Sequence, residues 1–194
     1  MARIGLNYCV YSPLTEDEEA GTFTYGAGKR GRKLIQADIK LNISDSKLYA
    51  DDNIAESLRE FIDGTLTIGQ DDLTDVMKTD WLGNTATSVT VGSDTVSELS
   101  SKDTDIAPYH GLGYIQPKVV DSVRQYRAIW FTKIQFGEPD ESGSTKGQSI
   151  SWQTPSVVGT IMRRLDGIWK EETTVPTLAT AIAWLKDKAG IPAA

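Results

Sequence analysis

The amino-acid sequence predicts a mainly β protein, in which two packed antiparallel sheets form a sandwich or barrel flanked by one or two α-helices. One observation is the alternation of apolar and polar residues, which recurs along much of the chain and is typical of strands. Another is that helical spacing of apolar residues is confined to two segments. With 194 residues, 39% hydrophobic and 24% charged, the chain fits one domain, 1–194, with extended loops and a C-terminal helix.

The strands are predicted in order from the amino terminus. The clearest alternation is in 34–44, where polar residues separate the apolar Ile35, Ala37, Ile39, Leu41 and Ile43. Pro13 is expected to end the first strand, and Pro155 to break the seventh. The segment 81–106, rich in Ser, Thr, Asp and Gly, is interpreted as hairpin and loop. The predicted strands are 3–11, 22–25, 34–44, 60–69, 109–120, 126–136, 148–161 and 168–172.

Two segments have the apolar spacing of amphipathic helices. Asp72 can cap the first helix and Gly83 can end it. Thr177 can cap the second, and Gly190 can end it. We interpret both apolar stripes as core packing. The residues expected to form these stripes are Leu73, Val76, Met77 and Trp81 in the first helix and Leu178, Ala181, Ile182 and Leu185 in the second.

The segment 25–33, YGAGKRGRK, contains a G-x-G-x-x-G pattern at 26–31 among four cations. In dinucleotide-binding proteins this pattern precedes a helix whose N-terminus holds the pyrophosphate. Here the alternating segment 34–44 follows, so a strand is predicted where the nucleotide site would need a helix. We therefore interpret 26–31 as a glycine-rich basic hairpin loop, and we expect no nucleotide and no other cofactor.

The residues that usually carry catalysis are scarce or badly spaced. The one histidine, His110, and the one cysteine, Cys9, cannot build a zinc site of the usual N/S type, and Cys9 lies in an apolar run typical of a packed thiol. Asp51 and Asp52 lie in ADDN, which has the residue types of a tight turn. That spacing suits neither a glycosidase carboxylate pair nor a Ca²⁺ loop. We expect no catalytic residue, no metal site and no enzyme activity.

Charge and hydropathy exclude further classes. The net charge of −7 argues against a protein that grips nucleic acid, because such grip comes from cations that neutralise phosphates. No apolar run approaches the ~20 residues of a membrane span, so no membrane insertion is expected. A non-catalytic carbohydrate- or peptide-binding β-sandwich is the alternative. It would need an exposed aromatic platform, whereas the tryptophans fall mostly on predicted apolar faces.

The chain contains, in this order, the segments IGLNYCVYSPLTEDEEAGTFTYG, KLYADDNIAES, GTLTIGQDDLTDVMKTDWLG, DIAPYHGLGY, YRAIWFTKIQFGEPDESGSTKGQSISWQTPSVVGTIMRR and DGIWK. Together they resemble the major tail proteins, or tail tube proteins, of long non-contractile-tailed phages and prophages of Gram-positive bacteria. The similar segments cover most of the chain, and 85–104 is the least characteristic part. None of them is a catalytic motif, so the resemblance rests on their order.

The resemblance implies a structural virion protein with a tail tube fold. Such proteins pack two β-sheets with a helix, join into hexameric rings and stack into a tube, which is the conduit for DNA ejection. The implied partners are further copies of the chain, the tape-measure protein, the tail-end proteins, and double-stranded DNA in transit without specific binding. The implied location is the phage tail, after synthesis and assembly in the host bacterial cytoplasm.

Within such a tube, the apolar set of 34–44 is expected to face the sandwich core and the polar set to face the lumen. The residues expected to face the lumen are Gln36, Asp38, Lys40, Asn42, Arg59 and Asp63. Rings that stack head to tail need complementary ends, and the chain has acidic clusters at Glu16–Glu19 and Asp51–Asp52. The basic loop is therefore expected to contact acidic residues of another subunit, with a solvated loop as the alternative. The residues expected at intersubunit contacts are Lys29, Arg30, Arg32, Lys33, Asp51 and Asp52.

Overall fold

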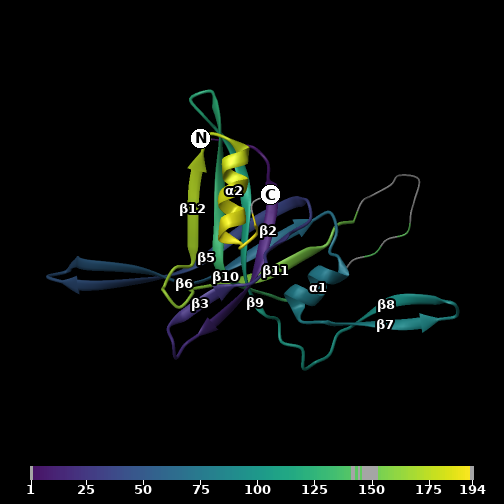
Figure 1. Ribbon diagram of the computed structural model, residues 1–194. Coiled ribbons are helices and arrows are strands. Elements are labelled where there is room, and N and C mark those ends of the chain that lie inside the picture. The colour runs from purple at the N-terminus through teal and green to yellow at the C-terminus, as the bar shows by residue number, and fades with distance from the viewer. Residues whose placement is uncertain (1, 141–142, 144, 146–152, 193–194) are drawn as a thin grey trace.

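The computed structural model describes residues 2–140, 143, 145 and 153–192. It confirms a mainly β fold of two antiparallel sheets with two flanking helices (Figure 1). The helices are α1 (Asp75–Leu82) and α2 (Leu178–Lys188). The strands are β1 (Ala2–Arg3), β2 (Asn7–Asp17), β3 (Thr22–Tyr25), β4 (Lys29–Arg30), β5 (Leu34–Ala50), β6 (Asn53–Gln70), β7 (Thr85–Val91), β8 (Asp94–Ser100), β9 (Tyr109–Val120), β10 (Val123–Phe136), β11 (Ser156–Met162) and β12 (Lys170–Val175).

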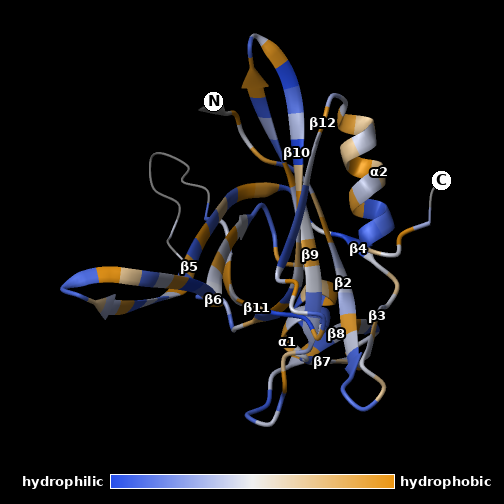
Figure 2. Cartoon of the chain, turned by 90° about the vertical axis from the view of Figure 1, so that its left-hand side faces the viewer, coloured by the Kyte–Doolittle hydropathy of each residue, from blue (hydrophilic) through white to orange (hydrophobic). Residues whose placement is uncertain are grey.

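Ten strands form one large sheet, and β7 with β8 forms a separate two-stranded sheet. The main path runs β3-β2-β9-β10-β11-β6-β5, with β1 beside β9, β4 beside β2 and β12 beside β10. Strand β10 pairs with β12 through residues 126–131 and with β11 through residues 133–136. The change of partner folds the sheet into two layers, one containing β2, β9 and β12 and the other containing β5, β6 and β11 (Figure 2).

Strands β2, β9 and β10 have a hydrophobic core on each face. On one face, Val10, Ile115 and Trp130 pack against Ala181 and Leu185 of α2. The opposite face packs against β6, β11 and α1, and its buried residues include Tyr11, Leu66, Ile68, Met77, Trp81, Leu112, Ile129, Phe131, Ile134 and Ile161. Burial on both sides explains why the middle of β10, residues 128–132, contains no exposed position.

A bulge in β10 distributes its apolar residues between the two cores. The register against β9 shifts by one residue between Phe131 and Ile134. An uninterrupted alternation would place Trp130 and Ile134 on the same face, but the extra residue reverses the face that follows it. Trp130 therefore packs under α2, whereas Ile134 and Phe136 pack in the opposite core.

Most of the predicted strands are confirmed, and several are longer than predicted. Strands β3 and β9 match 22–25 and 109–120, and the segment 81–106 contains the β7–β8 hairpin. The expectation that Pro13 ends the first strand is wrong, because β2 continues to Asp17. Pro13 lies where the outer partner of β2 changes from β4 to β3, so its missing N–H interrupts no ladder there. Strand β11 begins just after Pro155, and 148–152 lies outside the described residues.

Helix α2 is confirmed as predicted, whereas α1 begins later. The Thr177 hydroxyl accepts from the amide of Thr180 at 3.1 Å and caps α2. In α1 the cap is Thr74 rather than Asp72, and Gly83 ends the helix with a left-handed φ of 79°. Leu73, Met77 and Trp81 are buried as predicted, but Val76 is 57% exposed. The prediction that Val76 packs in the core is wrong, because α1 contacts the body along a narrow line of residues spaced four apart.

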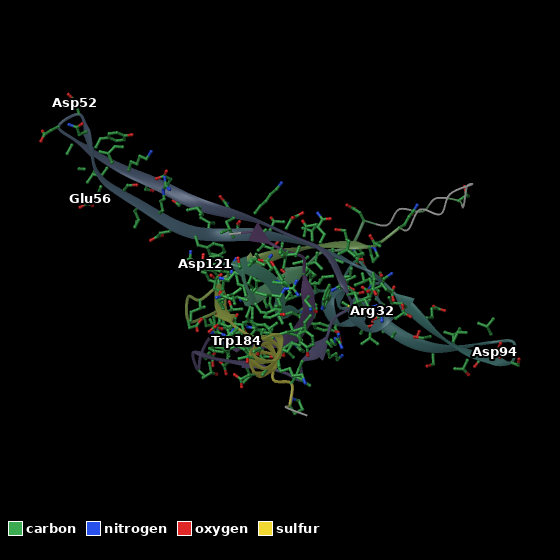
Figure 3. All side chains as sticks on the ribbon, turned by 90° about the horizontal axis from the view of Figure 1, so that it is seen from above. Arg32, Asp52, Glu56, Asp94, Asp121 and Trp184 are labelled. Carbon is green, nitrogen blue, oxygen red and sulfur yellow. The ribbon has the colours of Figure 1, made fainter. Side chains whose placement is uncertain are left out.

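Strands β5 and β6 form a long hairpin that leaves the body (Figures 1 and 3). The apolar set of 34–44 was expected to face the core, but only Ala37 packs against it. This expectation is wrong for the isolated chain, because the core ends beneath the base of the hairpin, at the buried Leu66 and Ile68. The remaining members of the set are between 38% and 56% exposed, and they are Ile35, Ile39, Leu41 and Ile43.

Candidate assembly surfaces

The glycine-rich loop at 26–31 is built for close packing. A Cβ on Gly28 would lie 2.1 Å from the carbonyl oxygen of Ala189, and a Cβ on Gly31 would lie 2.9 Å from the sulfur of Cys9. The amide of Gly31 donates to the carbonyl of Cys9 at 2.9 Å. The short strand β4 lies within this loop, and β5 follows it, which confirms the predicted strand. The glycines therefore let the loop approach the C-terminal end of α2 and strand β2.

The cations of this loop differ in their partners. The Lys29 ammonium forms an ion pair with Asp80 of α1 at 2.8 Å. The Arg32 guanidinium lies 3.6 Å from Asp71 and 3.7 Å from the neighbouring Asp72. These intrachain pairs are partly exposed, so each contributes at most about 1 kcal/mol and can exchange for another carboxylate.

Arg30 and Lys33 differ from Lys29 and Arg32 in their ion pairing. The Arg30 guanidinium lies over the ring of Tyr8, 5.1 Å from its centroid. Within the described residues, no carboxylate lies at ion-pair distance from the side chain of Arg30 or Lys33. Both side chains are exposed, so they are the members of the predicted basic set with most capacity for an external anion.

The predicted acidic partners, Asp51 and Asp52, lie at the far end of the β5–β6 hairpin (Figure 3). Their φ angles are 51° and 59°, which fit the two central positions of a type I′ turn between Ala50 and Asn53. The turn predicted for ADDN is confirmed. In Figure 3 this turn projects away from the body, and Arg32 lies on the opposite side of the body. The structure thus does not bring the acidic and basic sets together within one chain.

We call the part of the β5–β6 hairpin in which 34–44 pairs with 60–70 the hairpin base. Most of the residues predicted to face a lumen lie on one side of it. Asp38 opposes Thr67, Lys40 opposes Thr65, and Asn42 opposes Asp63, and directly opposed residues share a face of a sheet. Gln36 belongs to the same face through its pairing with Gly69 and its hydrogen bond to Asp38. This polar face is opposite the face that carries the buried Leu66 and Ile68.

The prediction that Arg59 and Asp63 lie on the same face of the hairpin is wrong. The register passes from Asn42–Asp63 to Ile43–Phe61, so Ile62 is an extra residue on β6. A bulge of this kind reverses the face of every residue beyond it. Phe61 therefore turns toward the core side, where its ring stacks on Trp169 at 4.4 Å. Arg59 follows Phe61 to that side and lies 3.3 Å from Asp45.

The corrected face has a different charge balance. Its ionised residues are Asp38, Lys40, Asp63 and Glu60, which opposes Ser44 on the same face; they are three carboxylates and one ammonium. The face therefore carries two net negative charges, whereas the set that included Arg59 in place of Glu60 was neutral. A weakly acidic, polar surface repels phosphates and offers few contacts that release counterions.

The apolar residues near the end of the hairpin are not among the predicted site residues. Leu48, Tyr49, Ile54 and Leu58 flank the acidic turn and are each more than half exposed. Apolar residues on both sides of a tight turn are the usual signal of a hairpin, and this signal was present in KLYADDNIAESL. It predicts the pairing of the strands, but it does not say whether a partner covers them.

The residues with reactive side chains are buried in the core. Burial lowers the pKa of His110, whose Nδ1 lies 3.0 Å from the carbonyl oxygen of Pro108. Burial raises the pKa of the Cys9 thiol to about 12, so it is a packed thiol as predicted. Their exposures are 1% and 2%. Across the part of the chain that the structure describes, no cluster of His, Cys, Asp and Glu is arranged to hold a metal ion.

A second set of polar contacts joins β3 to the turn between β11 and β12. The Arg164 guanidinium lies 3.7 Å from the centroid of the Phe23 ring, and its Nη1 donates to the hydroxyl of Tyr25 at 3.2 Å. A hydrogen bond from Arg164 lowers the pKa of Asp166. Arg164 is 7% exposed, so these contacts satisfy a nearly buried charge and hold the β2–β3 hairpin on the body.

None of the helices within the described residues is long and apolar enough to cross a membrane. Comparison of the chain with protein-family models finds no match. Comparison with curated proteins likewise finds no match.

Proposed function

We propose that the chain is a structural subunit that self-assembles into stacked hexameric rings and forms the tube of a phage tail. The observation that carries this proposal is the apolar surface exposed along the β5–β6 hairpin, visible as orange segments in Figure 2. A hairpin in water is marginally stable on its own, so a partner that covers these residues would stabilise it. The exposed residues are Ile35, Ile39, Leu41, Ile43, Leu48, Tyr49, Ile54, Leu58 and Ile62.

The free edge of β5 supports assembly through continuous sheet. Strand β5 is the last strand on the main path of the sheet, and it is 17 residues long. A long edge strand presents unpaired backbone groups and readily adds a strand from another chain. In the proposed ring this edge pairs with a neighbouring subunit, and the apolar side of 34–44 becomes buried between subunits.

The polar face of the hairpin base then lines the lumen. Gln36, Asp38, Lys40, Asn42 and Asp63 would face passing DNA, and their weak negative charge would keep it from binding. The tube would enclose the tape-measure protein, meet the tail-end proteins, and assemble in the host bacterial cytoplasm before it becomes part of the virion. The proposal assigns the chain no catalytic role. The order of the segments that resemble tail tube proteins supports it.

Electron microscopy and sedimentation of the purified chain test the proposal. Rings or tubes are expected from the unaltered protein. Ile39→Ser with Leu41→Ser should block assembly, because both side chains belong to the exposed apolar face. Gln36→Ser with Asn42→Ser, a matched change on the polar face, should leave assembly intact.

A chain that stays monomeric at every accessible concentration would contradict the proposal and favour a β-sandwich binding module. Such a module needs a platform of exposed aromatic rings. In the described part of the chain the exposed rings are Tyr49 and Tyr109, on different strands, β5 and β9. They form no platform, so the binding module has less support.

A further inference from the structure

The end of the β5–β6 hairpin, Leu48–Leu58, exposes apolar side chains on both of its faces. We call this segment the hairpin tip. Tyr49 opposes Ile54 on one face, and these side chains are 64% and 53% exposed. Leu48 and Leu58 lie diagonally on the other face and are 59% and 60% exposed. A recess that accepts such a ribbon would bury both of its apolar faces at once.

The hairpin tip is also acidic. It contains Asp51, Asp52 and Glu56 and no lysine or arginine. The first two occupy the turn, beyond the last strand pair, Ala50 with Asn53. A recess that accepts the tip should therefore combine apolar walls with cations near its end.

A groove on the body has this composition. Its volume is about 780 Å³, within the ~300–1,000 Å³ typical of cavities that bind ligands. The cations Arg30, Arg32 and Lys33 line it, and Asp71 is the carboxylate in the lining. We call it the basic groove. Its apolar lining includes Leu6, Tyr8 and Leu34.

Tyr8 is held in this groove by an unusual backbone. Its φ is 48°, in the left-handed region that a bulky residue rarely adopts. The register of β2 against β9 shifts between Asn7 and Cys9, so Tyr8 is the bulged residue. Such strained positions cost about 1–3 kcal/mol and gather at binding sites, where the surrounding structure maintains them. Arg30 lies over the ring of Tyr8, which gives the groove an aromatic wall next to a cation.

The hairpin tip and the basic groove lie on opposite sides of the molecule. In Figure 3, Asp52 marks the end of the hairpin and Arg32 lies across the body from it. A chain therefore cannot place its tip in its own groove. The matched surfaces are different patches of one chain, and such a pair forms a head-to-tail contact that repeats from copy to copy.

We propose that the hairpin tip of one copy inserts into the basic groove of a second copy, where its apolar side chains contact the apolar lining and its carboxylates face Arg30 and Lys33. These two cations have no carboxylate partner within the described residues. Arg32, which pairs with Asp71 and Asp72, can share its charge with the incoming turn. The inference rests on the proposed self-assembly and names the contact that links successive copies.

Cross-linking between single-cysteine chains tests the contact, in a Cys9→Ser background. One chain carries Ala50→Cys at the tip, and the other carries Asn7→Cys, an exposed position of the groove lining. A mixture treated with a short bismaleimide should give the mixed dimer in at least about tenfold excess over a control mixture. The control replaces Asn7→Cys with Ser93→Cys, exposed in the β7–β8 turn. Equal yields from the two mixtures would overturn the contact.

Charge reversal provides an independent arm. Asp51→Lys with Asp52→Lys in the tip chain, or Arg30→Glu with Lys33→Glu in the groove chain, should each lower the yield by about tenfold. The two reversed chains mixed together should recover it. Failure of this pair to cross-link would overturn the charge assignment, even if each reversed chain remains folded by circular dichroism.

The outcomes separate this contact from the proposed function. Cross-linked dimers from a chain that forms neither rings nor tubes would support the contact and contradict the tube. Tubes of normal length from the Asp51→Lys, Asp52→Lys chain would support the tube and overturn the contact.

Discussion

Reversing the charge of the polar face should convert it into a surface that binds DNA. The change is Asp38→Lys with Asp63→Lys, two positions on the same face as Lys40. The unaltered face has two net negative charges from Asp38, Lys40, Asp63 and Glu60, and the variant would have three lysines and one carboxylate, Glu60, there. If each lysine contacts one phosphate, raising the salt from about 50 to about 200 mM should weaken binding about 40-fold, from a slope of about 0.9 per contact.

Fluorescence anisotropy with a short labelled duplex measures this effect. The unaltered chain should show no binding at about 50 mM salt, where screening is weakest. A matched control carries the same charge change on other exposed surfaces, as Asp94→Lys with Asp103→Lys. It should bind more weakly and with a smaller salt slope, because its added lysines are not clustered beside Lys40.

Equal affinity for DNA in the variant and the control would refute the reasoning, because the geometry of the face would then have no effect. In assembled tubes the same double variant should look normal by microscopy but should impair DNA delivery, most strongly at low salt. Normal delivery through such tubes, or labelling that shows position 38 inaccessible from the lumen, would contradict the assignment of this face.

Three further predictions concern the fold and the glycine-rich loop. Gly113→Ala should lower Tm by roughly 4–12 °C, because its methyl would lie 2.6 Å from Leu185 and overpacking costs about 2–3 kcal/mol. Gly137→Ala, with no atom closer than 3.6 Å, should change Tm little in the same thermal scan, and equal shifts would contradict the packing argument. Burial lowers the pKa of His110, so its contribution to stability is present above about pH 6.5 and is lost as the pH falls. Denaturant unfolding at about pH 7.5 and about pH 5.5 should show this loss of stability. The variant His110→Gln should lose less stability between the two pH values. An unchanged pH slope in that variant would assign the loss to other groups. Calorimetry with ATP, NAD and NADP should show no saturable binding at 26–31, because the strand β5 follows in place of a helix, and micromolar binding would contradict this.

Local chemistry made several elements predictable. The strand after 26–31 follows from a period of two that extends over many residues, and α2 follows from its Thr177 cap and helical spacing. The ADDN turn follows from residue types that tolerate a positive φ. Each of these features depends on contacts within a few residues of the chain, so the sequence alone contains the information.

Bulges limited the prediction of faces. A single extra residue at Ile62 separates Arg59 from Asp63, and another at Tyr8 places that residue in the lining of the basic groove. The pairing partner decides where an extra residue is accommodated, and alternation within one strand does not reveal it. Sequence reasoning therefore assigned the polar residues of β5 to one face correctly and misplaced Arg59 on β6.

The sequence by itself determined where most of the strands and both helices form, and that the chain has charged loops of both signs. Only the tertiary structure decided which apolar residues are covered. Ile39 and Leu41 have the same alternation as a core strand, yet they lie beyond the edge of the packed layers and remain exposed. The basic groove likewise depends on the close approach of β2, the loop at 26–33 and Asp71. Burial is a property of distant segments meeting in space, and local residue patterns do not specify where that meeting ends.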